Sequence, residues 1–173
     1  MSASVFVDTN VFVYARDAGE PGKQPQAAAW LEHLWREQLG RTSVQVLSEY
    51  YVTVTRKLDP GLSPADAWDD VRALLAWRPW PVDAPLLERG REIGLRHKLG
   101  WWDALIVAAA EAQGCGLLLS EDLQDGGVYA GVTVRSPFTL RAREPRTEYA
   151  AIAGPRSRHP PRGRPKRTPA ARP

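Results

Sequence analysis

Four acidic residues stand at positions in this sequence that suggest chemistry. Asp8 and Asp122 each follow a short apolar run, Asp103 opens an alanine-rich segment, and Glu49 lies among apolar residues at helical spacing. Carboxylates that are brought together raise each other's pKa unless a cation compensates their charge. Hard ions such as Mg²⁺ take oxygen ligands, activate water and neutralise charge on a phosphate. If the four acids converge, the chemistry that suits them is metal-assisted hydrolysis of a phosphodiester.

The elements that must position these acids alternate along the chain. Apolar, β-branched runs predict strands, and apolar residues at helical spacing between capping residues and glycine stops predict helices. Strands are expected at residues 4–7, 80–82, 117–120 and 132–135, and helices after residues 8–10 and at 27–39, 43–54, 63–77, 84–98 and 103–113. This alternation predicts an α/β fold of three layers, with a mostly parallel central sheet flanked by helices.

In parallel sheets, ligands bind in the crevice outside the carboxyl ends of the strands. Asp8 and Asp122 lie just beyond two expected strand ends, and Asp103 can project into the same crevice from a helix start. Each acid also has a structural interpretation. Asp8 can cap a helix or form an Asx-turn, Asp103 can interact with a helix dipole, Glu49 can belong to a solvated face, and Asp122 can be a turn residue. From the residues alone, both interpretations stay open.

Length and composition fit one globular domain with a sizeable core. The chain has 173 residues, of which 43% are hydrophobic and 25% charged. Domains commonly hold about 100–150 residues, so there is room for one domain and a tail. Seven tryptophans predict a large contribution of aromatic area to the core.

Charge is distributed unevenly along the chain. Residues 1–140 hold 13 basic and 18 acidic residues, whereas residues 141–173 hold 10 basic and only two acidic residues. We therefore expect a globular domain over residues 1–145 and a disordered basic tail, rich in proline and arginine, over residues 146–173. Such a tail is either a nucleic-acid-binding arm or a solvated linker, and the sequence leaves both open.

Cysteine usage and hydropathy bound the location of the protein. The single Cys115 excludes an intramolecular disulfide framework and a cysteine-based zinc site, and its apolar surroundings predict an inert buried thiol. No secretory signal is visible, and no segment approaches the roughly 18 apolar residues that span a bilayer. We expect a soluble, cytoplasmic protein with no membrane partner.

Four segments, taken in order, resemble the PIN-domain nucleases. They are the apolar run that ends in Asp8-Thr9-Asn10-Val11, the helical Glu49, the block at residues 102–110 and the block at residues 118–123. Within that family they most resemble the VapC-type toxin ribonucleases of type II toxin–antitoxin pairs. The resemblance covers roughly residues 4–140. Asp-Thr-Asn alone is a weak motif, but the ordered set of four segments is specific.

The resemblance implies a PIN-like fold and a role for each matching residue. Asp8, Glu49 and Asp103 match the three core acids of the metal site, and Asp122 matches the fourth. Thr9, Asn10 and Ser120 match polar residues that support these acids, and Asp125 is a candidate for holding a second metal. The implied mechanism is hydrolysis of RNA by water activated by Mg²⁺ or Mn²⁺, without a covalent intermediate. The implied partners are an RNA substrate, a cognate antitoxin and a second copy of the chain in a homodimer.

Two other functions remain open at this stage. A PIN-like module that binds RNA or protein without cutting is the first, and a housekeeping PIN nuclease without an antitoxin is the second. Arg56, Lys57 and Lys98 are candidates for a basic rim that binds RNA phosphates, although charged helix faces are also expected on purely structural grounds. Trp101 and Trp102 can stack a base, pack in the core or form a dimer seam.

Overall fold

The computed structural model describes residues 3–140. Its elements in chain order are β1 (Val5–Val7), α1 (Thr9–Arg16), α2 (Gln24–Arg36), β2 (Gly40–Arg41), α3 (Val44–Arg56), α4 (Pro64–Leu74), the 3₁₀ helix η1 (Leu75–Trp77), α5 (Ala84–His97), α6 (Trp101–Ala112), β3 (Leu117–Leu119), β4 (Val128–Tyr129) and β5 (Val132–Arg135). The domain boundary expected at residue 145 and the basic tail lie outside the described residues. Over residues 3–140, no helix is both long enough and apolar enough to cross a membrane.

The strands form one sheet in the order β2-β1-β3-β5-β4. β1 pairs in parallel with β2 and β3, β3 pairs in parallel with β5, and only β4 runs antiparallel to its neighbour. β1 and β3 are the central strands, and every residue in them is buried. Their continuous apolar sequences follow from this position, because a parallel strand covered on both faces has no solvent-exposed side.

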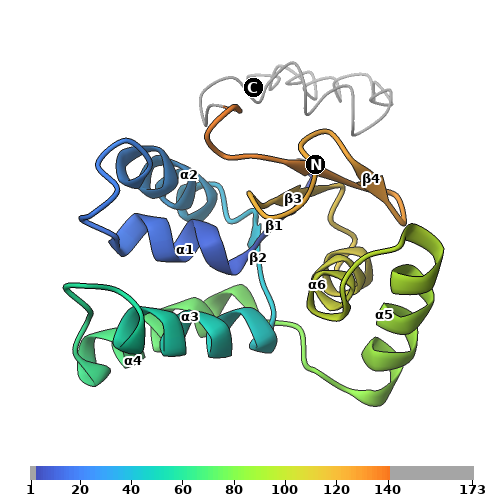
Figure 1. The fold of residues 1–173 in the computed structure, drawn as a ribbon, viewed down its shortest axis with the longest axis horizontal. Helices are drawn as coiled ribbons and strands as arrows, with labels where there is room; N and C mark the ends of the chain where they lie inside the picture. The colour runs from blue at the N-terminus through green and yellow to red at the C-terminus, as the bar shows by residue number, and fades with distance from the viewer. Residues whose placement is uncertain (1–2, 141–173) are drawn as a thin grey trace, which may run out of the picture.

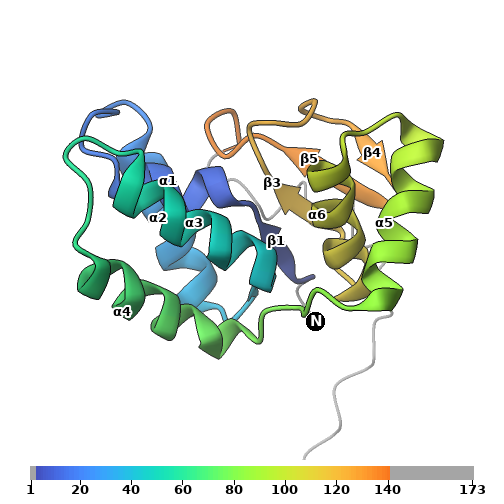
Figure 2. The same ribbon diagram turned by 60° about the horizontal axis from the view of Figure 1, so that its bottom comes forward.

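Helices cover both sides of the sheet. Figures 1 and 2 show α1 to α4 gathered on one side of β1 and β3, and α5 with α6 on the other. The predicted α/β fold with three layers and a mostly parallel sheet is therefore confirmed. Each expected helix is present, with ends that differ from the prediction by a few residues.

Local sequence signals explain where the helices begin. Ser43 starts α3, and its side chain accepts a hydrogen bond from the backbone N–H of Val46. Ser63 caps α4 in the same way and is followed by Pro64 at the first helical position. Asp8 caps α1, where its carboxylate accepts a hydrogen bond from the backbone N–H of Thr9 at 2.7 Å. The capping interpretation of Asp8 is therefore correct, and it does not exclude a role in a site.

The structure differs from the predicted strands in three places. The strand expected at residues 80–82 is reduced to an isolated bridge between Ser43 and Trp80. Proline on each side of Trp80 removes the backbone N–H groups that a longer ladder needs. Gly40, expected only to end a helix, instead begins β2 and pairs with Val5. β4 was also missed, because a two-residue strand carries no detectable periodicity.

The tryptophans contribute less to the core than expected. Trp30 and Trp77 are buried, and Trp80 is partly buried. The other four are exposed: Trp35, Trp68, Trp101 and Trp102. The core is built mainly from aliphatic residues of the strands and of α6. The expected aromatic contribution to the core comes from Trp30 and Trp77 together with Tyr50, Phe6 and Phe12, and the four exposed indole rings need another explanation.

Gly40 provides a test of the packing between β2 and η1. A Cβ at this buried position would overlap the indole ring of Trp77. We expect Gly40→Ala to lower the free energy of unfolding by about 1–3 kcal/mol, because overpacking a filled site forces side chains and backbone to shift. Urea denaturation measures the change. Gly22→Ala is the matched control, since a Cβ there meets nothing within 4 Å; equal stability of the two variants would contradict the packing described.

Candidate active site

The carboxyl ends of β1 and β3 bring the first two acids together. Val7, the last residue of β1, pairs with Leu119, the last residue of β3. The next residue, Asp8, donates its backbone N–H to the carbonyl of Leu119 at 3.0 Å. Ser120 and Asp122 follow β3 directly and therefore lie beside Asp8. The predicted convergence at adjacent strand ends is present.

Ser120 holds the carboxylate of Asp8. Its Oγ donates a hydrogen bond to Asp8 Oδ2 at 2.7 Å, while the backbone N–H of Thr9 donates to Asp8 Oδ1. Ser120 is fully buried and Asp8 is only 6% exposed. The same Ser120 Oγ accepts the backbone N–H of Asp122 at 3.2 Å, so one hydroxyl connects the two acids.

Asn10 links Asp8 to Asp122 from the first turn of α1. Its Nδ2 donates to Asp122 Oδ2 at 3.0 Å and lies 3.4 Å from Asp8 Oδ2. Its Oδ1 accepts the backbone N–H of Glu121 at 3.4 Å. The two carboxylates therefore lie on either side of a single amide nitrogen.

Glu49 reaches the same site from the middle of α3. Its Oε2 accepts a hydrogen bond from Thr9 Oγ1 at 3.1 Å, and its Oε1 accepts one from Gln45 Nε2 at 2.9 Å. Gln45 also donates to the backbone carbonyl of Trp102 at 3.3 Å. This network ties α1, α3 and α6 together around the carboxylate.

Asp103 is in the first turn of α6, where the helix dipole favours an acid. Burial raises the pKa of its carboxyl, and the charges of Asp122 and Glu49 raise it further. No donor among residues 3–140 forms a hydrogen bond with this carboxylate, so both of its oxygens are available to a ligand.

The pKa of Asp8 reflects its burial beside the other acids. Burial raises it to about 6 from an ordinary value of 3.8, and the charges of Asp122 and Glu49 add to the rise. The hydrogen bonds from Ser120 and Thr9 act in the opposite direction without cancelling the effect. The four acids therefore form one negatively charged pocket.

A cleft of about 940 Å³ opens beside this pocket. Glu49 and Asp122 line it together with Trp102 at the start of α6 and Lys57 at the end of α3. Thr9 and Asn10, the polar pair that supports the acids, also line it. Its volume lies near the top of the roughly 300–1,000 Å³ range typical of ligand sites.

The remaining candidate residues lie in different surroundings. Asp125 accepts hydrogen bonds from Arg135 Nε, the backbone N–H of Ser136 and Thr139 Oγ1, which lower the pKa of its carboxyl despite the opposing effect of burial. These partners use both of its oxygens to hold the segment after β5. Asp125 is thus engaged in a structural cluster of its own.

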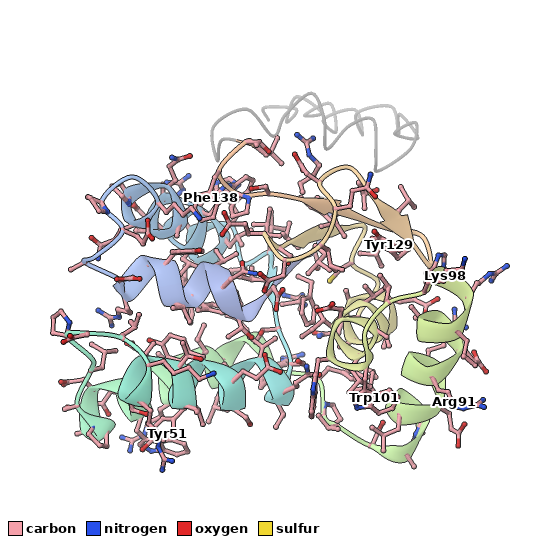
Figure 3. All side chains as sticks on the ribbon, viewed as in Figure 1. Tyr51, Arg91, Lys98, Trp101, Tyr129 and Phe138 are labelled. Carbon is pink, nitrogen blue, oxygen red and sulfur yellow. The ribbon has the colours of Figure 1, made fainter. Side chains whose placement is uncertain are left out.

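Of the three basic candidates, only Lys57 lines the cleft. Arg56 is exposed at the last turn of α3. Lys98 is exposed at the end of α5 that faces β4, where Figure 3 shows it near Tyr129. The structure therefore does not gather these three side chains into one basic rim.

Cys115, the single cysteine, is buried. Burial raises the pKa of its thiol to about 12, which leaves it protonated at neutral pH. The prediction of an inert buried thiol is confirmed, and Cys115 is not a nucleophile for this site.

Sequence reasoning missed two groups of residues around the site. Gln45 precedes Glu49 by four positions, so helical spacing alone places the two side chains together. Lys23 was missed for a different reason: its Nζ contacts Glu121 Oε1 at 2.5 Å and the hydroxyl of Tyr14 at 3.1 Å, across a long sequence separation that carries no local signal. Lys23 thereby connects the α2 start to the segment that carries Asp122.

Comparison with known proteins agrees with this geometry. The family model that describes the PIN domain matches residues 5–124, a range that includes all four acids. The chain belongs to the PIN-domain family. This domain is of the VapC type: the chain is 33% identical over 117 residues to Ribonuclease VapC23 from two strains of Mycobacterium tuberculosis, a match that covers 64% of this chain and 86% of the relative.

A solved structure supports the same assignment. The crystal structure of VapC20 from Mycobacterium tuberculosis, a Sarcin-Ricin loop cleaving toxin, superposes with a TM-score of 0.55 at 25% sequence identity. The match covers 75% of this chain and 99% of VapC20. The resemblance to VapC-type PIN nucleases inferred from the ordered acidic segments is therefore confirmed.

The pKa of Asp8 predicts how this PIN domain responds to pH. Because the folded-state pKa lies above the unfolded value, ionising Asp8 costs stability, and that cost appears as pH rises from about 4 through 6. We therefore compare the free energy of unfolding of Asp8→Asn with that of the wild type, both in EDTA. Between pH 4 and pH 7.5, the difference (variant minus wild type) should increase by up to about 3 kcal/mol, because only the wild type has to ionise the buried carboxyl of Asp8.

Urea denaturation across this pH range measures the difference. Asp125→Asn is the matched control with the opposite sign, since the lowered pKa of Asp125 adds stability above the ordinary aspartate pKa. A difference between Asp8→Asn and wild type that stays constant with pH would contradict the raised pKa.

Proposed function

We propose that this protein is a metal-dependent endoribonuclease and the toxin of a toxin–antitoxin pair. The observation that carries the proposal is the clustering of four acids: the charges of Glu49 and Asp122, which line the cleft, act on both Asp8 and Asp103. The names of its relatives support it, since VapC23 is a ribonuclease and VapC20 is a toxin that cleaves the Sarcin-Ricin loop.

The donor set fits Mg²⁺ or Mn²⁺. All four side chains offer hard oxygen ligands, and the raised pKa of buried Asp8 indicates negative charge that the protein itself does not neutralise. Within residues 3–140, no three histidine, cysteine, aspartate or glutamate side chains are arranged to hold an ion by themselves. Mg²⁺ is usually bound by one or two carboxylates, with water and substrate phosphate oxygens completing its shell, so an open acidic pocket suits it.

Asp8 and Asp103 are the proposed principal ligands, with Glu49 and Asp122 beside them. The bound ion would lower the pKa of a water molecule and offset charge on the phosphate. Ser120 and the Thr9 N–H fix Asp8, while Thr9 Oγ1 and Gln45 fix Glu49. The carboxylates of Asp8 and Glu49 are thus held in a fixed orientation before the reaction, so they do not have to reorient during it.

Hydrolysis requires a nucleophile, and water is the one proposed. The hydroxyl of Ser120 is fully buried and donates to Asp8, and the thiol of Cys115 is buried and protonated. Water attacks phosphorus, the bond to the leaving sugar oxygen breaks, and no covalent enzyme intermediate forms.

The biological setting is part of the same proposal. The protein acts on RNA in the cytoplasm, forms a homodimer and is silenced by a cognate antitoxin that covers the cleft. These statements rest on the likeness to VapC-type toxins. The proposed site holds no second metal at Asp125, because Arg135, Ser136 and Thr139 already bind its oxygens.

Removal of one acid tests the proposed activity. Asp103→Asn should reduce cleavage of a structured RNA in Mn²⁺ or Mg²⁺ by about 100-fold or more, because charge stabilisation by the metal is worth several kcal/mol. EDTA should abolish cleavage by the wild type. Asp125→Asn is the matched control and should retain activity within a few-fold. RNA cleavage is followed by gel electrophoresis with mapping of the new ends.

Two results would count against the proposal. Cleavage that survives both EDTA and Asp103→Asn would come from a contaminant, and failure of the wild type to cut a varied panel of RNAs would favour a binding module. In cells, induction of the wild type should arrest growth while Asp103→Asn should not. Equal growth arrest by both proteins would show that toxicity does not depend on nuclease activity, and would contradict the proposed toxin mechanism.

Ser120→Ala tests the role of the hydrogen bond that holds Asp8. We expect activity to fall about 10- to 100-fold and Mn²⁺ affinity to weaken, as happens when a partner of a metal ligand is removed. Because the Ser120 hydrogen bond lowers the pKa of Asp8, its loss should move the acidic limb of the activity profile to higher pH. Ser136→Ala is the control, since within residues 3–140 its hydroxyl accepts only from the backbone N–H of Phe138. An unchanged pH profile would contradict the positioning role.

A further inference from the structure

Three exposed apolar side chains line the cleft beside the acids. Trp102 is 64% exposed, Val82 46% and Val52 44%, and all three line the cleft together with Glu49 and Asp122. Contiguous exposed apolar surface marks binding sites rather than ordinary solvated surface. The exposure of Trp102 therefore calls for a ligand that covers it.

The backbone of Trp102 is anchored to the acidic pocket. Its carbonyl oxygen accepts a hydrogen bond from Gln45 Nε2, the same nitrogen that donates to Glu49 Oε1. Its neighbour along α6 is Asp103. The indole ring thus projects from a point that is fixed relative to the acids, while the ring itself remains in solvent.

The surroundings of the ring define the chemistry of its ligand. Glu49 and Asp122 line the cleft, where a phosphate and its ion would bind. Val52 and Val82 line it as well, and Lys57 supplies a positive charge. A nucleotide combines the matching groups, because its base has two apolar π-faces and is joined through one sugar to a phosphate. Aromatic side chains stack bases of any sequence.

We propose that the indole ring of Trp102 stacks one unpaired nucleobase of the RNA, next to the phosphodiester that is cut. This proposal rests on the proposed ribonuclease function and adds a base-binding subsite to it. The base must be unpaired, because within a helix both of its faces are covered by neighbouring bases. The cleft accordingly selects single strands, loops and bulges.

Trp101 and Trp68 offer matched comparisons. Trp101 precedes Trp102 on α6 and is also exposed, but it is not among the residues that line the cleft. Figure 3 marks its place. Trp68 is exposed on α4, where its ring contacts Tyr51 edge-on. Replacing either ring removes exposed indole surface of the same kind without touching the subsite.

Binding is measured on Asp103→Asn protein, which leaves RNA intact, in Mg²⁺ with a fluorescein-labelled single strand of about 12 nucleotides. Trp102→Ala should weaken binding about 5- to 150-fold, and Trp102→Phe should lose less because phenylalanine also stacks. Trp101→Ala and Trp68→Ala should bind like their parent. A fully paired duplex should bind with little dependence on residue 102. Equal melting temperatures would exclude loss of folding as the cause.

An abasic series identifies the stacking partner. The same strand is prepared with one abasic nucleotide, moved position by position. At one position, loss of the base should weaken binding to the parent protein as much as Trp102→Ala weakens binding of the intact strand. With that abasic strand, Trp102→Ala should cause little further loss of affinity. Such non-additivity is the signature of a direct contact. A flat series, with equal effects of Trp102→Ala at every position, would overturn the proposal.

Cleavage kinetics separate this inference from the nuclease proposal. In otherwise wild-type protein, Trp102→Ala should raise KM and leave kcat nearly unchanged, because a stacked base is bound alike before and during reaction. Cleavage with unchanged KM and unchanged binding would overturn the subsite and leave the nuclease intact. Absence of any cleavage, with Trp102-dependent binding of single strands, would overturn the nuclease and support the subsite.

A second copy of the chain is the other occupant that the test addresses. Sedimentation velocity at the concentration of the binding assay follows the oligomeric state of the parent and of Trp102→Ala. If Trp102→Ala dissociates a dimer and the abasic series is flat, the ring belongs to a protein interface and the base subsite is overturned. An unchanged oligomeric state together with a single sensitive position supports it.

Discussion

Burial of the Asp8 carboxylate beside other acids is the constraint on which this site depends. Asp8 is almost fully buried, and burial together with the charges of Asp122 and Glu49 raises its pKa to about 6. The hydrogen bonds from Ser120 and Thr9 offset only part of this cost. A buried anion that its surroundings do not neutralise favours any cation that can reach it. The proposed metal would therefore relieve a strain that the fold itself creates.

The fold concentrates this charge through a small number of connections. Asp8 directly follows β1, donates its backbone N–H to Leu119 of β3, caps α1 and holds its carboxylate against Ser120, so one residue serves the sheet, the helix and the site. The positive ends of the dipoles of α1 and α6 lie at the pocket, where they partly compensate the acids. Because Val7 and Leu119 are paired in the sheet, the separation of Asp8 from the segment after β3 is set by backbone geometry.

Sequence patterns predicted what local rules control and missed what depends on tertiary contacts. Asp8 and Asp122 were identifiable because apolar strands end beside them, and Glu49 because the surrounding helix was periodic. β2 was invisible, since its two residues, Gly40–Arg41, have no pattern of their own and pair only because β1 lies alongside. Asp125 stands near Asp122 in the sequence, yet its partners come from the segment after β5, which no local rule could foresee.

In the proposed mechanism the metal site contacts only a phosphate group, which is the same at every position of an RNA. Selection of a site must therefore come from groups outside the acids, and they must be held rigidly to them. On α6, Trp102 and Asp103 are consecutive, so their side chains leave the helix about 100° apart. Gln45 binds both the carbonyl of Trp102 and the carboxylate of Glu49. A shift of this helix start would displace the Trp102 ring and the Asp103 carboxylate together, so the proposed base subsite and the proposed metal site would keep their relative positions.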